Sequence, residues 1–459
     1  MKPLWKPCAT LGTLACSCLL ALADGPTDAM QQKLEALEKK VEVLETKLSD
    51  AGVAGDSEKA DTAKQKALFG LGSQSDATFH LGAYGEMKYG SKQTTTGWHD
   101  GFDAGRFVLL PTWQLADNII LNAEIEFEHG GFAGGADDKR SGSAEIEQAY
   151  IDFKFNDHVN WRAPGIDVVP FGYTNLHHEP TQFYSVDRPE LYNGLIPSTW
   201  AEGATSVYGN IVDNLDYQFQ INTGLEDTQG TGSTPAGTYT AGISGTDALS
   251  NSRSPVGDFS QTKNSPGFAT RLAYTLPWVP GLAGSTSVFH TSNITPRDAH
   301  DDLGNPLGDN SLTMFDTELR YRIPKSGFEL RGEYVSLFFS NPSNLRANND
   351  SDATNNVGHS MWGASGEAAY HWLLAPKVKN GWEIVPFYRY TYEDFQTGGF
   401  AGSDANAPTG QGQKQFHTFG IAAFPTPQIV LKLNYQKALD NSPTGPKADA
   451  LLGAVGFAF

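Results

Sequence analysis

Two groups of residues between 174 and 200 have side chains suited to chemistry or binding. The first is His177-His178-Glu179, whose imidazole and carboxylate groups are ligands that transition metals accept. Adjacent residues in a loop rarely point at one ion, and no third ligand stands out in the sequence. We therefore interpret them as ordinary loop residues and expect no metal site. The second group is the charged set Asp187, Arg188 and Glu190.

The sequence lacks the motifs that would indicate an enzyme. It contains no Gly-x-Ser-x-Gly, no phosphate-binding glycine-rich loop and no His-Glu-x-x-His. We expect no catalytic activity and no cofactor. The formal net charge of -19 argues against binding to nucleic acid or to anionic membrane surfaces.

Alternating apolar and polar residues fill the chain from residue 77 to its end. Between Asn118 and His129, isoleucine, leucine and phenylalanine take one face, while Glu124, Glu126 and Glu128 take the other. The last stretch, Ala448 to Phe459, alternates in the same way and ends on an aromatic residue. Such runs predict β-strands with one apolar face. Sixteen of them begin near residues 77, 101, 118, 144, 165, 201, 214, 266, 283, 311, 327, 358, 382, 413, 427 and 449.

The links between these runs alternate in length. Seven are short, and an even, up-and-down barrel with both ends on one side needs this alternation. The competing interpretation, a soluble array of two or three β-sandwich domains, does not need links that alternate in length. We predict an all-β fold in which residues 77–459 form a 16-stranded antiparallel transmembrane β-barrel. The eight long polar links lie near 90–100, 130–143, 174–200, 225–265, 295–310, 341–357, 397–412 and 439–448.

The charged face of each run indicates which side of the barrel meets water. A small barrel fills its interior with apolar side chains, whereas sixteen strands leave room for an aqueous channel. We therefore place the apolar faces outside and the charges inside. Aromatic residues near strand ends, such as Tyr89, Trp113, Tyr173 and Tyr435, suit membrane interfaces. By strand parity, the pore lining should include Arg106, Glu124, Glu126, Glu128, Lys154, Arg271, Arg320, Arg322, Arg331 and Arg389.

The third long link differs from the others because it carries apolar anchors such as Phe183, Tyr184, Leu191 and Leu195. A loop of this kind should pack on something. On an open barrel it can fold inward and narrow the pore. We expect it to bring Asp187, Arg188 and Glu190 to the narrowest point, where charges influence which solutes pass.

Three short stretches resemble one known family, the phosphate-selective porin O and P family. They are Val169-Pro170-Phe171-Gly172, the run Phe183–Pro189 and the run Gly203–Gly209. The resemblance implies a sixteen-stranded, trimeric outer-membrane porin whose third loop lines the constriction. Phosphate selectivity in that family goes with clusters of basic residues. The acidic composition of this chain departs from that pattern and argues against phosphate specificity.

The N-terminal part divides into three segments. Residues 1–23 are typical of a signal peptide, with Lys2 and Lys6 before an apolar run. All 3 cysteines of the chain lie within these 23 residues. Removing those two lysines would change the formal charge from -19 to -21. Residues 24–50 contain a heptad pattern and predict a short coiled-coil helix, also resembling the dicarboxylate-type branch of such porins. A lone amphipathic helix is the alternative, and the heptads leave dimer and trimer open. Residues 51–76 read as a flexible linker.

These predictions combine into one functional hypothesis. We expect a porin in the outer membrane of a Gram-negative-type bacterium, with its N-terminal helix in the periplasm. It would let small hydrophilic, charged solutes diffuse passively through a water-filled barrel, and its partners would be outer-membrane lipids and two further copies in a homotrimer. One alternative is a structural protein that tethers the envelope through its coiled coil. Another is a barrel that encloses partner electron carriers.

Overall fold

The computed structural model describes residues 78–94, 96–131, 142–227, 242–245, 248–249, 252, 265–296, 299, 305–348, 357–373, 381–398, 412–440 and 449–459. The predicted signal peptide, coiled-coil helix and linker lie outside these residues. Among the residues described, no helix has the length and apolarity needed to cross a membrane.

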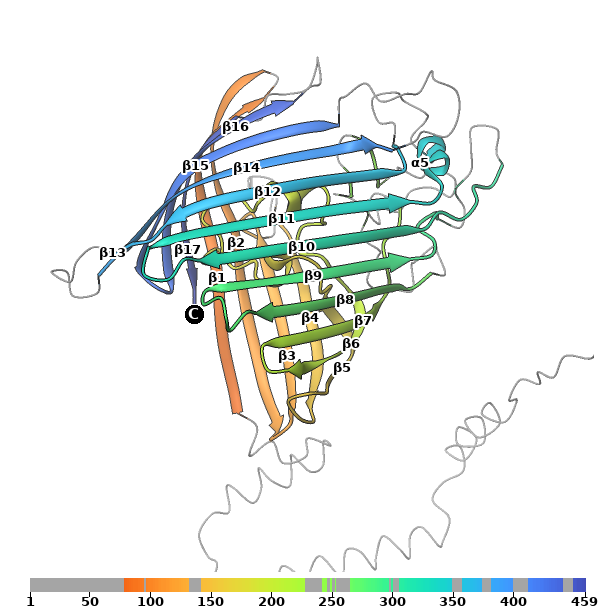
Figure 1. Ribbon diagram of the computed structural model, residues 1–459, viewed down its shortest axis with the longest axis horizontal. Helices are drawn as coiled ribbons and strands as arrows, with labels where there is room; N and C mark the ends of the chain where they lie inside the picture. The colour runs from red at the N-terminus through yellow and green to blue at the C-terminus, as the bar shows by residue number, and fades with distance from the viewer. Residues whose placement is uncertain are drawn as a thin grey trace, which may run out of the picture. The chain divides into compact units, whose positions relative to one another are not determined.

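The described chain is built almost entirely of strands, joined by links that hold two short helices and one 3-10 turn (Figure 1). The helices are α4 (Tyr173–Leu176) and α5 (Pro342–Asn348), and the turn is η2 (Glu190–Asn193). The strands are β1 (Thr78–Thr94), β2 (Gly97–Ala116), β3 (Ile119–Glu128), β4 (Ala144–Lys154), β5 (Asn160–Val168), β6 (Ala201–Val212), β7 (Leu215–Asn222), β8 (Gly267–Thr275), β9 (Leu282–Thr291), β10 (Leu312–Arg322), β11 (Phe328–Phe339), β12 (Ser360–Tyr370), β13 (Trp372–Leu373), β14 (Glu383–Thr397), β15 (Gln413–Thr426), β16 (Ile429–Asp440) and β17 (Ala450–Ala458).

The sheet closes on itself. Each strand pairs antiparallel with its neighbours in sequence, and the first strand, β1, also pairs with the last, β17. The two-residue β13 continues the line of β12 after an interruption at His371, and both pair with β14. The seventeen segments therefore occupy sixteen positions around a closed barrel, which confirms the predicted fold.

The strand starts follow the prediction closely, since all but the second and the fifth begin within two residues of it. The prediction of the first long link is wrong. Instead of a loop over 90–100, β1 and β2 stay paired to Thr94 and Gly97. Backbone hydrogen bonds need no apolar side chains, so pairing continues through polar residues such as Lys92 and His99 after the apolar alternation has ended.

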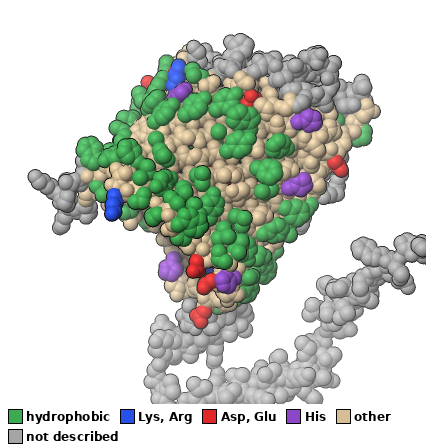
Figure 2. All heavy atoms as spheres, viewed as in Figure 1, with side chains coloured by type: hydrophobic (Ala, Val, Ile, Leu, Met, Phe, Trp, Pro, Cys, Tyr) green, Lys and Arg blue, Asp and Glu red, His purple; other side chains and the backbone are tan. Residues whose placement is uncertain are grey.

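The polarity of this barrel is inverted relative to that of a small soluble barrel. On β16, Leu433 points outward with 57% of its surface exposed, while the neighbouring Lys432 points inward and is 4% exposed. Figure 2 shows hydrophobic side chains spread over the strand-covered face, with few charged side chains among them. The predicted assignment of faces is therefore confirmed. Tyr173 is an exception to the aromatic prediction, because it lies in α4 and contacts Arg320 instead of facing outward.

The interior changes character along the strands between β8 and β14. Near the long links, inward-facing residues such as Met314, Leu337 and Phe289 belong to an apolar core. Further along the same strands, toward the short links, the inward-facing residues are charged, as at Arg320 and Glu329. The barrel interior thus has an apolar layer beside a polar one.

Closure through β17 offers a direct test of the fold. Val455 lies mid-strand, opposite Met87 of β1 and Leu431 of β16. A proline there fixes φ and cannot donate a hydrogen bond to the ladder in the middle of a sheet, so proline is confined to edge strands, strand starts and bulges. We expect Val455→Pro to lose the compact, SDS-resistant form that a closed barrel shows on unheated gels. The matched Val455→Ala variant keeps the backbone donor and should retain that form; loss in both would contradict the reasoning.

Candidate functional site

Residues 169–200, which we call the inner loop, link β5 to β6, and the first and last residues of this loop lie side by side. The side chain of Asn175 joins the two ends: Nδ2 donates to the carbonyl of Val169 at 2.9 Å, and Oδ1 accepts from the backbone N–H of Trp200 at 2.6 Å. Because Asn175 is buried and these backbone groups need partners, this amide fixes the base of the loop.

From this base, the inner loop reaches residues in the middle of strands far apart around the ring. Asp187 contacts Lys88 of β1, and the backbone N–H of Tyr173 donates to Glu318 of β10 at 3.0 Å. Glu190 contacts Arg389 of β14, and the N–H of Val186 donates to Asn434 of β16 at 2.7 Å. A segment with such contacts lies inside the barrel, across its bore.

Apolar anchors hold the inner loop against one sector of the wall. Leu191, Leu195 and Trp200 are fully buried in the apolar core that also contains wall residues from β8 to β14. The fit is close, because a Cβ at Gly363 of β12 would come within 2.6 Å of the Leu195 side chain. On another side, a Cβ at Gly456 of β17 would come within 2.7 Å of Pro180. The predicted inward packing of this link has a physical basis in these contacts.

Glu190 is the most heavily bonded charge of the inner loop. Both of its oxygens accept hydrogen bonds from the Arg389 guanidinium, with Nε–Oε2 and Nη2–Oε1 distances of 3.0 Å. Thr391 donates to Oε2 at 2.8 Å, and Thr418 and Gln436 donate to Oε1 at 3.1 Å and 2.5 Å. Burial alone would raise the pKa of Glu190, but Arg389 and these hydrogen bonds outweigh burial and lower it. This carboxylate ties the loop to three strands.

Asp187 and Arg188 differ from Glu190 in their surroundings. Asp187 forms ion pairs with Lys88 and Lys92, each at 3.0 Å, and its side chain keeps 36% of its surface exposed. The Arg188 guanidinium donates to the Ser198 hydroxyl within the loop. Burial, with repulsion from Arg106, lowers the pKa of Arg188 to about 10, while Glu147 opposes the shift.

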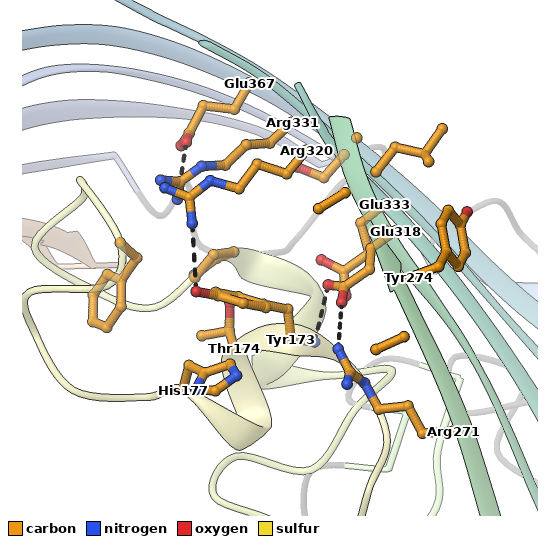
Figure 3. Close-up of a pocket in the computed structure, with 18 of the residues that line it drawn as sticks. Tyr173, Thr174, His177, Arg271, Tyr274, Glu318, Arg320, Arg331, Glu333 and Glu367 are labelled. Carbon is orange, nitrogen blue, oxygen red and sulfur yellow. Dashed lines mark hydrogen bonds and ion pairs between the residues drawn. The ribbon is translucent and has the colours of Figure 1, made fainter. Parts of the chain in front are cut away.

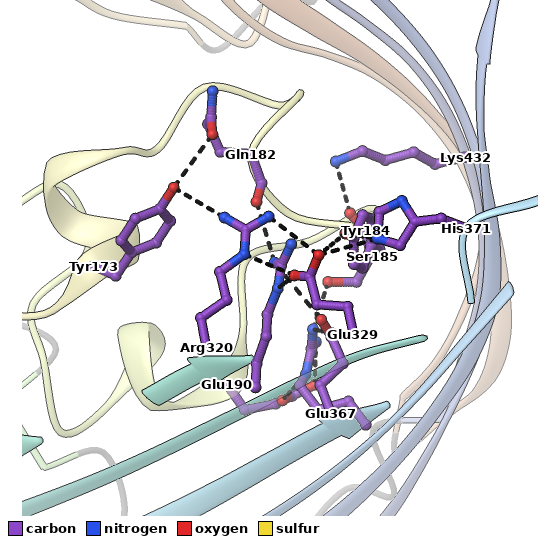
Figure 4. A network of polar contacts seen from close by, with 12 residues as sticks. Tyr173, Gln182, Tyr184, Ser185, Glu190, Arg320, Glu329, Glu367, His371 and Lys432 are labelled. Atoms are coloured by element: carbon purple, nitrogen blue, oxygen red, sulfur yellow. Dashed lines mark hydrogen bonds and ion pairs between the residues drawn. The ribbon is translucent and has the colours of Figure 1, made fainter. Parts of the chain in front are cut away.

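A second polar network surrounds Glu329 of β11 (Figure 4). Arg320 and Arg331 both place their Nε atoms on its Oε1, at 2.8 Å and 2.5 Å, and His371 lies 3.0 Å from Oε2. Tyr184 of the inner loop donates to the same carboxylate at 3.3 Å. The wall arginines are thus paired with wall carboxylates in this region, and the inner loop contacts the pairs.

A cavity of about 370 Å³ lies between the inner loop and the wall from β7 to β14 (Figure 3). Tyr173, Thr174 and His177 face it from the inner loop. Of its arginines, Arg320 has the most exposed side chain, at 38%. The wall contributes charges of both signs: Arg271, Glu318, Arg320, Arg331, Glu333, Glu367 and Arg389.

All ten wall residues predicted to line the pore face the interior, although most have a partner there. Arg106 pairs with Glu86, Lys154 with Asp152, Arg271 with Glu318, and Arg322 with Glu383. Glu124 accepts from Tyr84 and Gln148, and Glu128 from Ser143 at 3.3 Å. Glu126 is buried next to them. The structure brings Arg271, Arg320, Arg331 and Arg389 to the cavity beside the inner loop, and Arg106 and Glu124 contact the loop at His178.

Sequence reasoning missed several polar residues at or beside the inner loop. Glu367 of β12, which pairs with Arg389, and His371, which contacts Tyr184, carry no signal beyond strand parity. Glu147 lies at a register shift between β3 and β4 that parity counting cannot detect. The sequence shows no third ligand beside His177-His178-Glu179, because the carboxylates near His178 belong to β3 and β4. Among the residues that the structure describes, two groups of side chains could hold a metal ion: Glu124, Glu147 and His178, and Glu126, Glu128 and Glu145.

Comparison with known proteins places the fold among outer-membrane channels. The outer membrane channel DcaP of Acinetobacter baumannii matches with a TM-score of 0.50 and 11% identity, over 84% of this chain and 99% of that one. OmpF of Salmonella typhi, in a complex with daunomycin, matches with a TM-score of 0.50 and 13% identity, over 83% and 97% of the two chains. At these identities the likeness shows the fold alone.

An uncharacterized protein of Aquifex aeolicus (strain VF5) is 27% identical over 360 residues, which cover 77% of this chain and 74% of that protein. No family model matches the sequence. The resemblance to the phosphate-selective porin O and P family therefore stays a prediction.

The contrast between Glu190 and Asp187 gives a prediction about how the inner loop is held. Removing one partner of a buried ion pair costs about 3–5 kcal/mol, whereas an exposed pair contributes up to about 1 kcal/mol. We expect Glu190→Ala to raise hydrogen exchange of amides in residues 185–196 by roughly 100-fold or more. The control, Asp187→Ala, should raise it less than about 10-fold. Equal effects would show that the Glu190 network does not anchor the loop.

Glu190 also predicts a pH dependence. Its folded pKa lies below the ordinary value, so its contribution is complete above that value and is lost as the pH falls toward the folded pKa. We expect the melting temperature of the detergent-solubilised barrel to fall between about pH 5 and about pH 3. Glu190→Gln should show a smaller fall over the same interval. An unchanged slope in the variant would remove Glu190 as a contributor.

Proposed function

We propose that this protein is an outer-membrane porin through which small hydrophilic solutes diffuse passively. The observation that carries the proposal is the inverted polarity of a closed sixteen-stranded barrel, whose apolar side chains face outward and whose charges face inward. An outward apolar surface suits a hydrocarbon surrounding, and inward charges require water or paired charges. The barrels of DcaP and OmpF support the same reading through their fold.

We propose that the inner loop narrows the passage and that Asp187, Arg188 and Glu190 act at the constriction. The loop contacts wall residues from β1 to β16, which supports a reduced bore. Its three charges have different exposures. Glu190 is 5% exposed and holds the loop in place, so Asp187 and its lysine partners are the charges that solutes would meet.

The cavity beside the inner loop suggests which solutes would pass. Its arginines stand beside carboxylates, as with Arg271 and Glu318, so it presents fixed charges of both signs in place of a purely basic surface. Such a lining orients polar solutes without holding one anion tightly. This arrangement supports a general passage for small charged solutes and does not favour phosphate specificity.

Location and assembly belong to the same proposal. We place the barrel in the outer membrane of a Gram-negative-type bacterium, among its lipids, with the N-terminal helix in the periplasm. We also propose a homotrimer: the heptad pattern of residues 30–50 supports association of several chains, and the resemblance to the porin O and P family supports three copies. Neither a cofactor nor a nucleic-acid partner enters the proposal.

Conductance across a planar bilayer tests the proposal. Purified wild-type protein should insert with discrete conductance steps, and an absence of steps would end the porin hypothesis. Arg320→Ala removes the arginine most exposed to the cavity, so ion selectivity should shift toward cations. Arg188→Ala tests the constriction in the same assay, by its effect on conductance and selectivity.

The matched control for Arg320→Ala is Lys437→Ala, which removes the same charge from the opposite face of the wall. Inward-facing residues of β16 are even-numbered, as at Lys432 and Asn434, so Lys437 faces outward. We expect its selectivity to match wild type. Equal shifts in the two variants would mean that the cavity does not lie on the conduction path.

A further inference from the structure

One side-chain cluster between the inner loop and the barrel wall remains unexplained by solute passage. It joins His178 of the inner loop to Glu124 of β3 and Glu147 of β4. The His178 Nε2 atom lies 3.3 Å from Glu124 Oε1 and 3.9 Å from Glu147 Oε2, and the three ligand atoms lie within 4.8 Å of one another. All three side chains are buried.

The orientation of the imidazole is fixed by the backbone. Its Nδ1 atom lies 2.8 Å from the carbonyl oxygen of Asn175, and because a carbonyl only accepts, Nδ1 carries the proton. In the neutral ring, Nε2 then presents a lone pair toward two carboxylates. Lone pair and carboxylate repel each other, so the arrangement calls for a cation between them or a second proton on the ring. A backbone carbonyl on the far nitrogen is also the usual support of a metal-ligating histidine.

Glu147 supplies the second observation. It is 6% exposed, and its Oε2 atom, the one nearest His178, accepts no hydrogen bond from any residue that the structure describes. A buried carboxylate oxygen without a partner is costly and needs an explanation. Glu124, in contrast, accepts from Tyr84 and Gln148, which orient it toward the same point.

The neighbouring cations, Arg106 and Arg188, attract Glu147 electrostatically, but among the described residues no hydrogen bond joins either of them to its Oε2 atom. The Nε atom of Arg106 lies 3.4 Å from Glu86, and its Nη2 donates to the carbonyl oxygen of His178, on the backbone side of the residue. Arg188 donates to Ser198. Glu126 is buried nearby and adds a further carboxylate, close enough to Glu147 for the two groups to share a hydrogen bond when one of them carries a proton.

We propose that His178 Nε2, Glu124 and Glu147 bind a divalent transition metal of the zinc class. Zinc bonds of about 2.0–2.2 Å place neighbouring ligand atoms of a tetrahedron roughly 3.4 Å apart. The observed separations of 3.3 Å and 3.9 Å need only small side-chain shifts to reach that geometry. One imidazole with two carboxylates suits zinc better than calcium or magnesium, which prefer all-oxygen sites.

Such a metal would fasten the inner loop to β3 and β4, whereas the Glu190 network fastens it to β14, β15 and β16. Of the run His177-His178-Glu179, only His178 joins the cluster. The ring of His177 lies against Tyr173, with 4.5 Å between centroids, and faces the cavity. The inference concerns binding alone, so it stands or falls independently of solute passage.

The test uses tag-free, full-length protein in detergent, freed of metal with a chelator and then titrated with zinc chloride. Wild type should bind one zinc ion per chain at this site, which isothermal titration calorimetry and metal analysis after dialysis both measure. His178→Ala and the isosteric Glu147→Gln should each lose this ion, or bind it at least about 10-fold more weakly. His177→Ala is the matched control and should bind like wild type.

Two further measurements keep the outcome clear. Heat-modifiable mobility on gels shows whether each variant still forms the closed barrel. Cobalt(II) in place of zinc should give the visible absorption of a four-coordinate site with nitrogen and oxygen ligands in wild type and His177→Ala only. No zinc binding by folded wild type, or equal loss in His177→Ala and His178→Ala, would overturn the proposal.

Discussion

Closure of the sheet is the constraint on which every other feature of this molecule depends. Once β17 pairs with β1, each strand has one face toward the interior and one toward the outside, and the two-residue period of the chain assigns every side chain to a side. No edge remains with unpaired backbone groups. The alternation of leucine with lysine or asparagine along β16, which would be unremarkable in an open sheet, becomes a division between an apolar exterior and a charged interior.

A charged interior must then be neutralised locally, and this requirement shapes the lumen. Glu329, for example, is enclosed by Arg320 and Arg331 on adjacent strands and by His371 at the break between β12 and β13. Buried charges without partners would cost several kcal/mol each. Ion pairs between neighbouring strands offset that cost. They also line the bore with charges of both signs in place of a single sign. The acidic balance of the whole chain therefore says little about the field that a solute would meet inside.

The sequence predicted the features that follow from local periodicity. Strand alternation, the sixteen positions of the wall and the inward side of residues such as Arg389 and Glu124 all follow from a period of two. It failed where contacts are long-range or the period breaks. The β1–β2 hairpin extends through polar residues that carry no apolar signal, and Tyr173 turns inward with the helix that contains it. His178 could not be matched with Glu147, because a loop residue and a wall residue share no spacing that sequence alone reveals.

The inner loop shows how a long link acquires a fixed conformation inside a wide barrel. An apolar anchor alone, such as Leu195 against Gly363, would hold one side of the loop and leave the other free to move. Polar contacts on other sides remove that freedom: Glu190 is bound by β14 and β15, and Val186 by β16. Because these contacts come from strands that are fixed relative to one another by closure, they over-determine the path of the loop. If the loop narrows the passage as we propose, a change in the anchoring residues would alter passage even when the exposed charges are untouched.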